Sequence, residues 1–249
     1  MVDTVIITGA TSGIGLALTK NYIEKGTKVY AIGRNYDKFL FVVKEWCQAR
    51  GWESLCEWIY SDFSVQNPLV NIDFTKFPKV DGFINCAGVL PIAPLKLETE
   101  EEIHIATNIN FLSPILFTRS LLKYNCIHKG GSIVFLGSIN GTKVGSKGHT
   151  IYSATKGGIT GFMMSLANEL SSLGIRVNVI SPGTVETPMA KKVESLIGTK
   201  GMKNYLDQYP LGAGTPQSLI PLINLLIDKK SASWITGQNF IVDGGYTVN

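Results

Sequence analysis

The chain has 249 residues, of which 45% are hydrophobic and 17% charged, with a formal net charge of +4. This size and composition predict a globular protein with a substantial core, organised as a single domain over residues 1–249. Basic residues are scattered rather than clustered, so we expect no nucleic-acid partner. The longest apolar stretch, 219–227, contains a proline and an asparagine and is too short for a membrane span, which takes roughly 18 residues.

The start of the chain and the cysteine pattern favour a cytoplasmic protein without a metal site. Met1-Val2-Asp3 leads directly into Val5-Ile6-Ile7, without the basic segment that opens a secretory signal. No two cysteines form a C-x-x-C pair, and the three histidines lie far from one another. We therefore expect reduced thiols and no zinc.

Short apolar segments alternate along the chain with longer helical ones. We expect strands at 5–8, 28–32, 57–60, 83–85, 133–136, 177–180 and 240–242, and helices at 14–25, 36–50, 99–124, 150–173 and 216–229. The strand segments are apolar throughout rather than alternating, which is typical of strands covered on both faces. The pattern predicts an α/β fold with a doubly wound parallel sheet of about seven strands.

Two connecting segments depart from this alternation. The stretch between residues 62 and 85 is short and contains Pro68 and Pro78, so we expect little helix there. After Pro182-Gly183 the chain runs through a polar segment, roughly 184–210, that includes Gly198 and Gly201. We predict that this segment is flexible, and its glycines suit a mobile lid.

A glycine-rich turn follows the first expected strand and opens the first expected helix. Gly9, Gly13 and Gly15 are spaced by three residues and then one, unlike the commonest dinucleotide fingerprint. Glycines permit a tight turn and close approach of the backbone to a pyrophosphate at a helix N-terminus. We expect the nucleotide to be bound by Gly9, Thr11, Ser12, Gly13, Ile14 and Gly15.

The residue after the second strand bears on the choice of cofactor. An acidic residue there would accept from the ribose 2′-hydroxyl and repel a 2′-phosphate, but the chain has Gly33-Arg34-Asn35. The planar cation of Arg34 suits a phosphate. We predict NADP rather than NAD, the alternative for Arg34 being a solvated surface residue.

Tyr152 and Lys156 are four residues apart in an expected helix. This spacing puts both side chains on one face. An ammonium beside a phenol favours the phenolate, so we expect Lys156 to lower the pKa of Tyr152 and make it a proton donor and acceptor near neutral pH.

These motifs together resemble the short-chain dehydrogenase/reductase family over essentially the whole chain. The resemblance rests on the glycine turn, on Asn85-Cys86-Ala87-Gly88, on Asn110, and on Ser138 with Tyr-x-x-x-Lys, and it extends to Ser181-Pro182-Gly183 and Asp243-Gly244-Gly245. It implies a Rossmann-type fold and reversible hydride transfer between a nicotinamide and a carbonyl/alcohol pair.

The resemblance implies that the segment of roughly 184–210 is a substrate loop that closes over the substrate, and it also implies roles for individual residues. Tyr152 is the expected acid, Ser138 the group that holds the carbonyl oxygen, and Lys156 the ligand of the nicotinamide ribose. Asp62 matches the residue that caps the adenine ring, although a simple loop acid is nearly as good an interpretation. The remaining cofactor contacts implied are Asn85, Ala87, Gly88, Pro182, Gly183, Val185 and Thr187.

Asn110 carries a separate physical hint. Pro114 lies four residues later and has no N–H, so the carbonyl of residue 110 loses its helical donor. In the family this carbonyl holds a water of a proton relay. We expect a kink that exposes it, the alternative being a kink that serves packing alone.

The substrate is left open by the sequence. Ser138, Tyr152 and His149 are the expected substrate contacts, although His149 also fits an exposed loop position. A 3-oxoacyl thioester, a sugar, a steroid and a small ketone all remain possible. The resemblance implies a homo-oligomer formed through 99–124 and 150–173. The alternative function is a catalytically silent, nucleotide-binding regulatory or scaffold protein.

Overall fold

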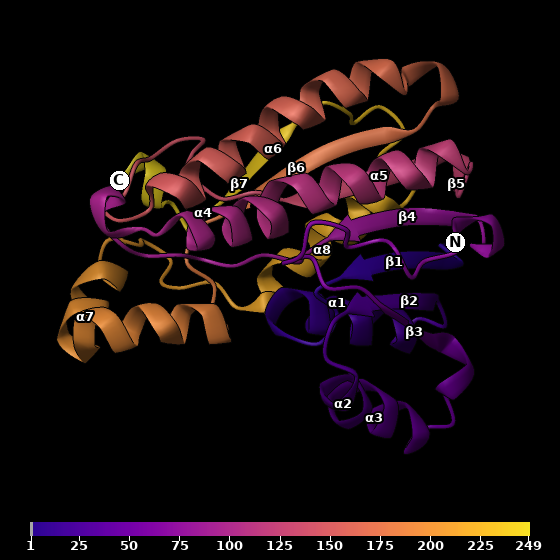
Figure 1. Ribbon diagram of the computed structural model, residues 1–249, viewed down its shortest axis with the longest axis horizontal. Helices are drawn as coiled ribbons and strands as arrows, with labels where there is room; N and C mark the ends of the chain where they lie inside the picture. The colour runs from indigo at the N-terminus through magenta and orange to yellow at the C-terminus, as the bar shows by residue number, and fades with distance from the viewer. Residues whose placement is uncertain (1) are drawn as a thin grey trace.

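The computed structural model describes residues 2–249 and places them around one parallel sheet flanked by helices (Figure 1). The sheet has the order β3-β2-β1-β4-β5-β6-β7, and each neighbouring pair is parallel. The predicted doubly wound sheet is therefore confirmed. Its strands are β1 Thr4–Thr8, β2 Lys28–Gly33, β3 Cys56–Tyr60, β4 Val80–Asn85, β5 Ile127–Leu136, β6 Arg176–Pro182 and β7 Asn239–Val242.

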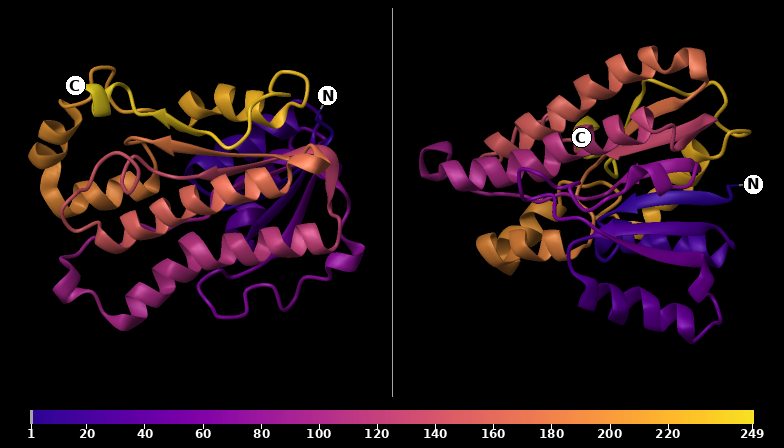
Figure 2. Two further views of the ribbon diagram at one scale, coloured as in Figure 1. Left: turned by 90° about the horizontal axis from the view of Figure 1, so that it is seen from above. Right: turned by 45° about the vertical axis from the view of Figure 1, so that its right-hand side comes forward.

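Helices cover both faces of the sheet and make three layers (Figure 2). One face carries α1 (Gly13–Glu24), α2 (Tyr36–Phe39), α3 (Glu45–Gln48) and α8 (Pro216–Ile227), and the other carries α4 (Glu100–Thr107), α5 (Ser113–Lys123) and α6 (Thr150–Glu169). In β1, Val5 and Ile7 join the core beneath α1 and α8, while Ile6 joins the core beneath α5 and α6. Because successive strand residues point to opposite faces, a strand between two helical layers has to be apolar throughout.

Two of the expected helices are interrupted by π-helical turns. The expected helix 36–50 is split by a turn at Leu40–Lys44, and the expected helix 99–124 by one at Asn108–Leu112. At the second turn the N–H of Ser113 donates to the carbonyl of Asn108. This wider step directly precedes Pro114, which has no N–H of its own, so a π turn stands where the sequence predicted a kink.

Residues 184–210 are not an irregular loop, because most of them form α7 (Pro188–Leu206), and the mobile lid stays a prediction. Thr187 caps its N-terminus by accepting from the Ala190 N–H, and Pro188 occupies the first turn. A Thr-Pro pair of this kind is a helix-start signal that the sequence analysis passed over. Gly198, at φ 73° and ψ 163°, breaks the helix into two parts.

The connection from β3 to β4 contains only a short 3-10 turn, Phe74–Lys76, as the prolines predicted. Within residues 2–249 no helix combines the length and the apolar character that crossing a membrane takes.

Candidate active site

The site lies at the carboxyl ends of β1 and β4, where the chain order in the sheet reverses. Thr8 and Asn85 are partners in the ladder, and the Thr8 hydroxyl donates to Asn85 Oδ1 at 2.8 Å. The Ala87 N–H donates to the same hydroxyl at 3.2 Å. Ligands of doubly wound sheets bind at this switch point, because the crossovers leave on opposite faces and open a crevice.

The glycine turn packs closely against the segment that follows β4. Gly9 has φ +66°, and a Cβ at this position would lie 2.9 Å from the Ala87 nitrogen. No other residue type fits there without movement of the backbone. Ser12 is the N-cap of α1, its side chain makes no capping bond, and the first turn holds no acidic residue. The amide groups of this helix end are thus left for an external anion.

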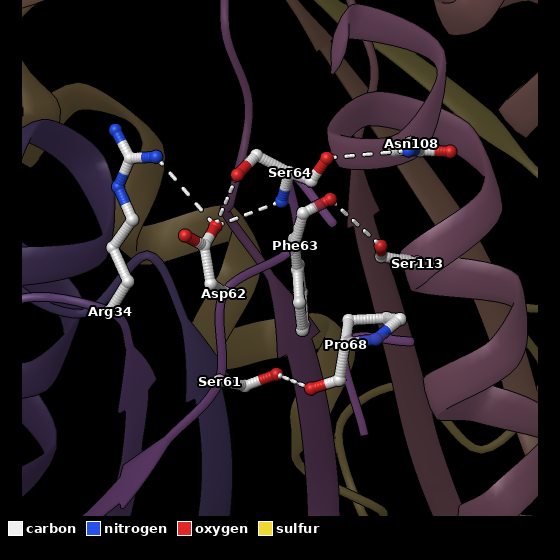
Figure 3. A network of polar contacts seen from close by, with 8 residues as sticks. All are labelled: Arg34, Ser61, Asp62, Phe63, Ser64, Pro68, Asn108 and Ser113. Atoms are coloured by element: carbon white, nitrogen blue, oxygen red, sulfur yellow. Dashed lines mark hydrogen bonds and ion pairs between the residues drawn. The ribbon is translucent and has the colours of Figure 1, made fainter. Parts of the chain in front are cut away.

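A cavity of about 310 Å³ extends from the glycine turn to the end of β2. Arg34 lines it, and its Nη1 lies 3.6 Å from Asp62 Oδ1 (Figure 3). Lys38 lines the same cavity and adds a second cation. The sequence analysis missed Lys38, although a lysine one helical turn after Arg34 was the available signal. The lining residues are Thr8, Gly9, Thr11, Ile32, Gly33, Arg34, Asn35, Lys38, Ser61, Asp62, Phe63, Ala87, Gly88, Val89 and Ile109.

Asp62 is held as a carboxylate by its neighbours. Its Oδ1 accepts from the Ser64 N–H at 2.9 Å and from the Ser64 hydroxyl at 2.7 Å. Partial burial acts to raise the pKa of Asp62, but the Ser64 bonds and the Arg34 guanidinium outweigh it and leave the pKa below its ordinary value.

The segment after β3 is tied to the π turn that carries Asn110. The Ser113 hydroxyl donates to the Phe63 carbonyl at 3.1 Å, and Asn108 Nδ2 donates to the Ser64 carbonyl at 3.3 Å (Figure 3). Both ends of the π turn are therefore fastened to the loop that holds Asp62.

A second cavity, of about 350 Å³, brings together Ser138, Tyr152, Lys156 and His149. Ser138 follows β5, and the other three come from the start of α6 and the residue before it. Pro182, Gly183, Val185 and Thr187 line the cavity from the side of β6 and α7. Asn140, Ser146 and Tyr205 line it as well and had no motif that could have identified them. Gly88 lines both cavities, so they meet there.

Lys156 is buried and points its Nζ at the Leu136 carbonyl, 2.7 Å away. A Cβ on Gly88 would lie 3.6 Å from this Nζ, which places the ammonium beside the junction of the two cavities. Burial lowers the pKa of Lys156 to about 8, and the Cys86 thiol acts in the opposite direction.

The predicted lowering of the Tyr152 pKa is not found in the protein alone. Burial raises the pKa of Tyr152, and the Ser138 hydroxyl opposes this only in part. The Lys156 Nζ lies 5.7 Å from the centre of the Tyr152 ring and hydrogen-bonds to Leu136 instead. The expectation was wrong because helical spacing gives the shared face but not the degree of burial.

Asn110 holds a backbone segment with its side-chain amide. Its Oδ1 accepts from the Val89 N–H at 2.8 Å, and its Nδ2 donates to the Val89 carbonyl at 2.9 Å and to Thr155 Oγ1 at 3.3 Å. Asn110 thereby connects the segment after Gly88 to α6. The exposure of its backbone carbonyl to water stays a prediction.

The residues present fit a nicotinamide dinucleotide on the geometry of the chain itself. The uncapped start of α1 suits a pyrophosphate, the cavity at Arg34 suits an adenosine end, and the cavity at Tyr152 suits a nicotinamide with a substrate beside it. Of the expected cofactor contacts, all but four line one of these cavities, and the four that do not are Ser12, Gly13, Gly15 and Asn85.

Comparison with known proteins agrees with this geometry. The short chain dehydrogenase family matches residues 3–197. A 3-oxoacyl-(acyl-carrier-protein) reductase of Chlamydia pneumoniae is 32% identical over 244 residues, covering 98% of this chain and 96% of the relative.

Solved structures of dehydrogenases also resemble this chain over nearly its whole length. A putative NAD(P)-dependent gluconate 5-dehydrogenase from Beutenbergia cavernae, with bound NADP, superposes with a TM-score of 0.87 at 26% identity and covers 99% of this chain and 97% of its own. A 4-hydroxyisoleucine dehydrogenase complexed with NADH gives 0.86 at 28% identity, with 99% of each chain covered. The chain belongs to the short-chain dehydrogenase/reductase family and is an NAD(P)-dependent oxidoreductase acting on CH–OH and carbonyl groups.

Proposed function

We propose that the protein transfers hydride from NADPH to a ketone, or in reverse from a secondary alcohol to NADP, in the cavity beneath α7. The observation that carries this proposal is the meeting of the two cavities at Gly88, with Tyr152, Lys156 and Ser138 at one end and Arg34 at the other. A bound nicotinamide would supply the hydride, a hydrogen nucleus with two electrons, to the carbonyl carbon.

The protein's own residues would handle the proton. Tyr152 gives its hydroxyl proton to the carbonyl oxygen, so that the C=O group becomes CH–OH, and the tyrosine is reprotonated from solvent. Ser138 holds the same oxygen through its hydroxyl. Lys156 binds the nicotinamide ribose and, by its charge, favours the transient phenolate. The side chain of Asn110 fixes the position of Val89 and of α6. Its backbone carbonyl is the proposed acceptor for the water of a proton relay.

Burial raises the pKa of Tyr152, so the phenol is protonated at neutral pH. Because a raised pKa also disfavours the phenolate, proton donation depends on the Lys156 ammonium to stabilise the anion as it forms. His149, whose ring centre is 6.2 Å from that of Tyr152, is proposed as a further substrate contact.

Replacement of Tyr152 by phenylalanine tests the proposal. We expect Tyr152→Phe to reduce ketone turnover by at least about 100-fold, the scale of general acid catalysis, because the proton donor is removed while the ring still fills its place. NADPH affinity, measured by fluorescence titration, should stay within about twofold. Retained turnover in this variant would contradict the assignment of Tyr152.

NADP preference is proposed from two cations at the adenosine end. Arg34 and Lys38 line one cavity, and the Arg34–Asp62 contact uses only one of the two terminal guanidinium nitrogens. The second nitrogen suits a 2′-phosphate. The relatives named above include both NADP- and NADH-bound structures, so the measurement has to come from this chain.

We expect Arg34→Ala to weaken NADPH binding by about 10-fold to 100-fold and to leave NADH binding nearly unchanged, because only NADPH carries the 2′-phosphate that would lose its partner. Arg119→Ala, on the exposed side of α5, is the matched control and should affect neither. Equal losses for the two nucleotides, or a wild-type preference for NADH, would refute the NADP assignment.

We also propose that residues 1–249 act as one catalytic domain, that the protein is a cytoplasmic homo-oligomer, and that it needs no metal ion, nucleic acid or membrane. The four cysteines are unpaired, in keeping with a reducing compartment. Exposed apolar side chains near α5 and on α6 support self-association.

A further inference from the structure

The cavity that contains Tyr152 is mostly apolar away from the reacting groups. Its first wall is the segment after β4 and the strand end after β5, and its second wall is α7, from both sides of the break at Gly198. The apolar side chains on these walls are Leu90, Ile139, Met189, Val193, Ile197 and Met202. Ile197 is also 46% exposed, so the cavity opens to solvent along that side chain.

Fixed charge is almost absent from this lining. Among the lining residues there is no aspartate, glutamate or arginine, and Lys156 is the one lysine. Its ammonium is already engaged by the Leu136 carbonyl. Lys191 and Lys192 lie on α7 but are exposed and outside the lining.

The one imidazole of the cavity is held in a form that accepts. His149 Nδ1 lies 3.0 Å from the Lys147 carbonyl. A carbonyl can only accept, so the ring proton of the neutral imidazole sits on Nδ1 and Nε2 is left as an acceptor. An acceptor suits a hydroxyl or an amide N–H of a substrate and gives no support to a carboxylate.

We infer that the substrate is an uncharged ketone or secondary alcohol on an apolar chain, and that the cavity rejects the same chain when it carries a carboxylate. This inference rests on the proposed function of the same site and adds the substrate class to it. A charged end group would lose its water on entering and meet no opposite charge in the lining, which is costly in an apolar cavity. Leu90, Met189 and Val193 are the residues that set this preference.

A pair of substrates that differ in one charge tests the inference. Methyl 7-oxooctanoate and the free carboxylate 7-oxooctanoate share the ketone and the chain. With NADPH and the full-length protein, we expect kcat/KM for the ester to exceed that for the carboxylate by at least about 100-fold.

Met189→Arg places a cation, on a longer unbranched side chain, at the cavity wall. It should narrow that ratio by about tenfold or more by raising kcat/KM for the carboxylate. Leu196→Arg is the matched control, because Leu196 lies on the same part of α7 but is 63% exposed and does not line the cavity. It should leave the ratio unchanged. Equal or better turnover of the carboxylate by the wild type, or an equal shift of the ratio in both variants, would overturn the inference.

A measurement of ketone binding distinguishes a failure of this inference from a failure of the proposed function. Calorimetric titration of each ketone into the protein saturated with NADP+ does not depend on turnover. Preferential binding of the ester supports the substrate class even if neither compound is reduced, in which case the proposed reaction fails alone. Equal binding of ester and carboxylate overturns the substrate class whether or not reduction is seen.

Discussion

At the scale of single residues, burial of Lys156 disfavours the ammonium charge that the proposed reaction needs beside Tyr152. Its ammonium is buried and donates a hydrogen bond to the Leu136 carbonyl, and its pKa is lowered from 10.5 to about 8. A lysine in this state destabilises the folded protein while protonated, because the unfolded chain binds the proton more tightly. The Lys156 ammonium therefore lowers the stability of the fold, which is consistent with a functional rather than a stabilising role for this residue.

This gives a pH dependence with a definite sign. The folded protein binds fewer protons than the unfolded chain between pH 8 and 10.5, so the cost is fully present below about pH 8 and disappears as the pH rises to 10.5. We expect the free energy of unfolding of the wild type to rise relative to Lys156→Met across this window, by on the order of 3 kcal/mol.

Urea denaturation of both proteins at pH 7, 8, 9 and 10 measures this difference, since titrations at other sites cancel between them. A difference that stays flat, or that falls with pH, would show that burial does not depress the pKa of Lys156.

At the scale of elements, α7 is held over the cavity by a cluster of tyrosines. The Thr184 N–H donates to the Tyr209 hydroxyl at 3.1 Å, and this hydroxyl lies 2.9 Å from both Thr184 Oγ1 and the Tyr205 hydroxyl. Tyr205 belongs to α7 and lines the cavity, while Tyr209 follows the helix. The network joins the end of α7 to the loop after β6. It therefore fixes the part of α7 that follows the break at Gly198.

Removal of the Tyr209 hydroxyl should loosen this end of α7. In Tyr209→Phe the Thr184 N–H loses its acceptor, and we expect a loss of about 1–3 kcal/mol in the free energy of unfolding together with a higher KM for the ketone. Tyr246→Phe is the control, because its ring stacks on Tyr209 with 4.6 Å between centres while its hydroxyl takes no part in the network. A Tyr209→Phe protein as stable as the control would mean that the hydroxyl network contributes nothing.

At the scale of the whole molecule, the exposed apolar side chains support self-association. Leu112, Leu116 and Met164 are 43%, 37% and 60% exposed, and they lie on the π turn, α5 and α6. Figure 1 shows α5 and α6 as the outer helices of one face of the sheet. Apolar side chains exposed together on helices of one face favour burial against another copy of the chain.

We expect light scattering to give a mass of two or four times the 27.1 kDa of one chain. Met164→Arg should shift the protein toward smaller species, because it would bury an unpaired cation in the interface. Val70→Arg, at a side chain 78% exposed in the β3–β4 connection, should leave the mass unchanged. A monomeric wild type at micromolar concentration would rule out the proposed association.

The sequence by itself determined the layered architecture and named the candidate reacting groups that the structure brings into one cavity. Strands buried on both faces require continuous apolar runs, so segments such as 133–136 are visible without any knowledge of their neighbours. The spacing of Tyr152 and Lys156 follows from helix geometry alone, and the three glycines of the first turn mark a backbone that only glycine permits. These are local properties, and the structure has the strand, the helix and the glycine turn at the predicted places.

The tertiary structure alone decided how distant segments act on these groups. It pairs Arg34 with Asp62 and directs Lys156 to the Leu136 carbonyl. It also buries Tyr152 deeply enough to raise its pKa, where helical spacing predicted the reverse, and it closes the cavity with an uncharged part of α7. Desolvation and ion pairing depend on all the neighbours of a side chain. Those neighbours come from segments far apart in the sequence, and no local pattern predicts which of them lie together.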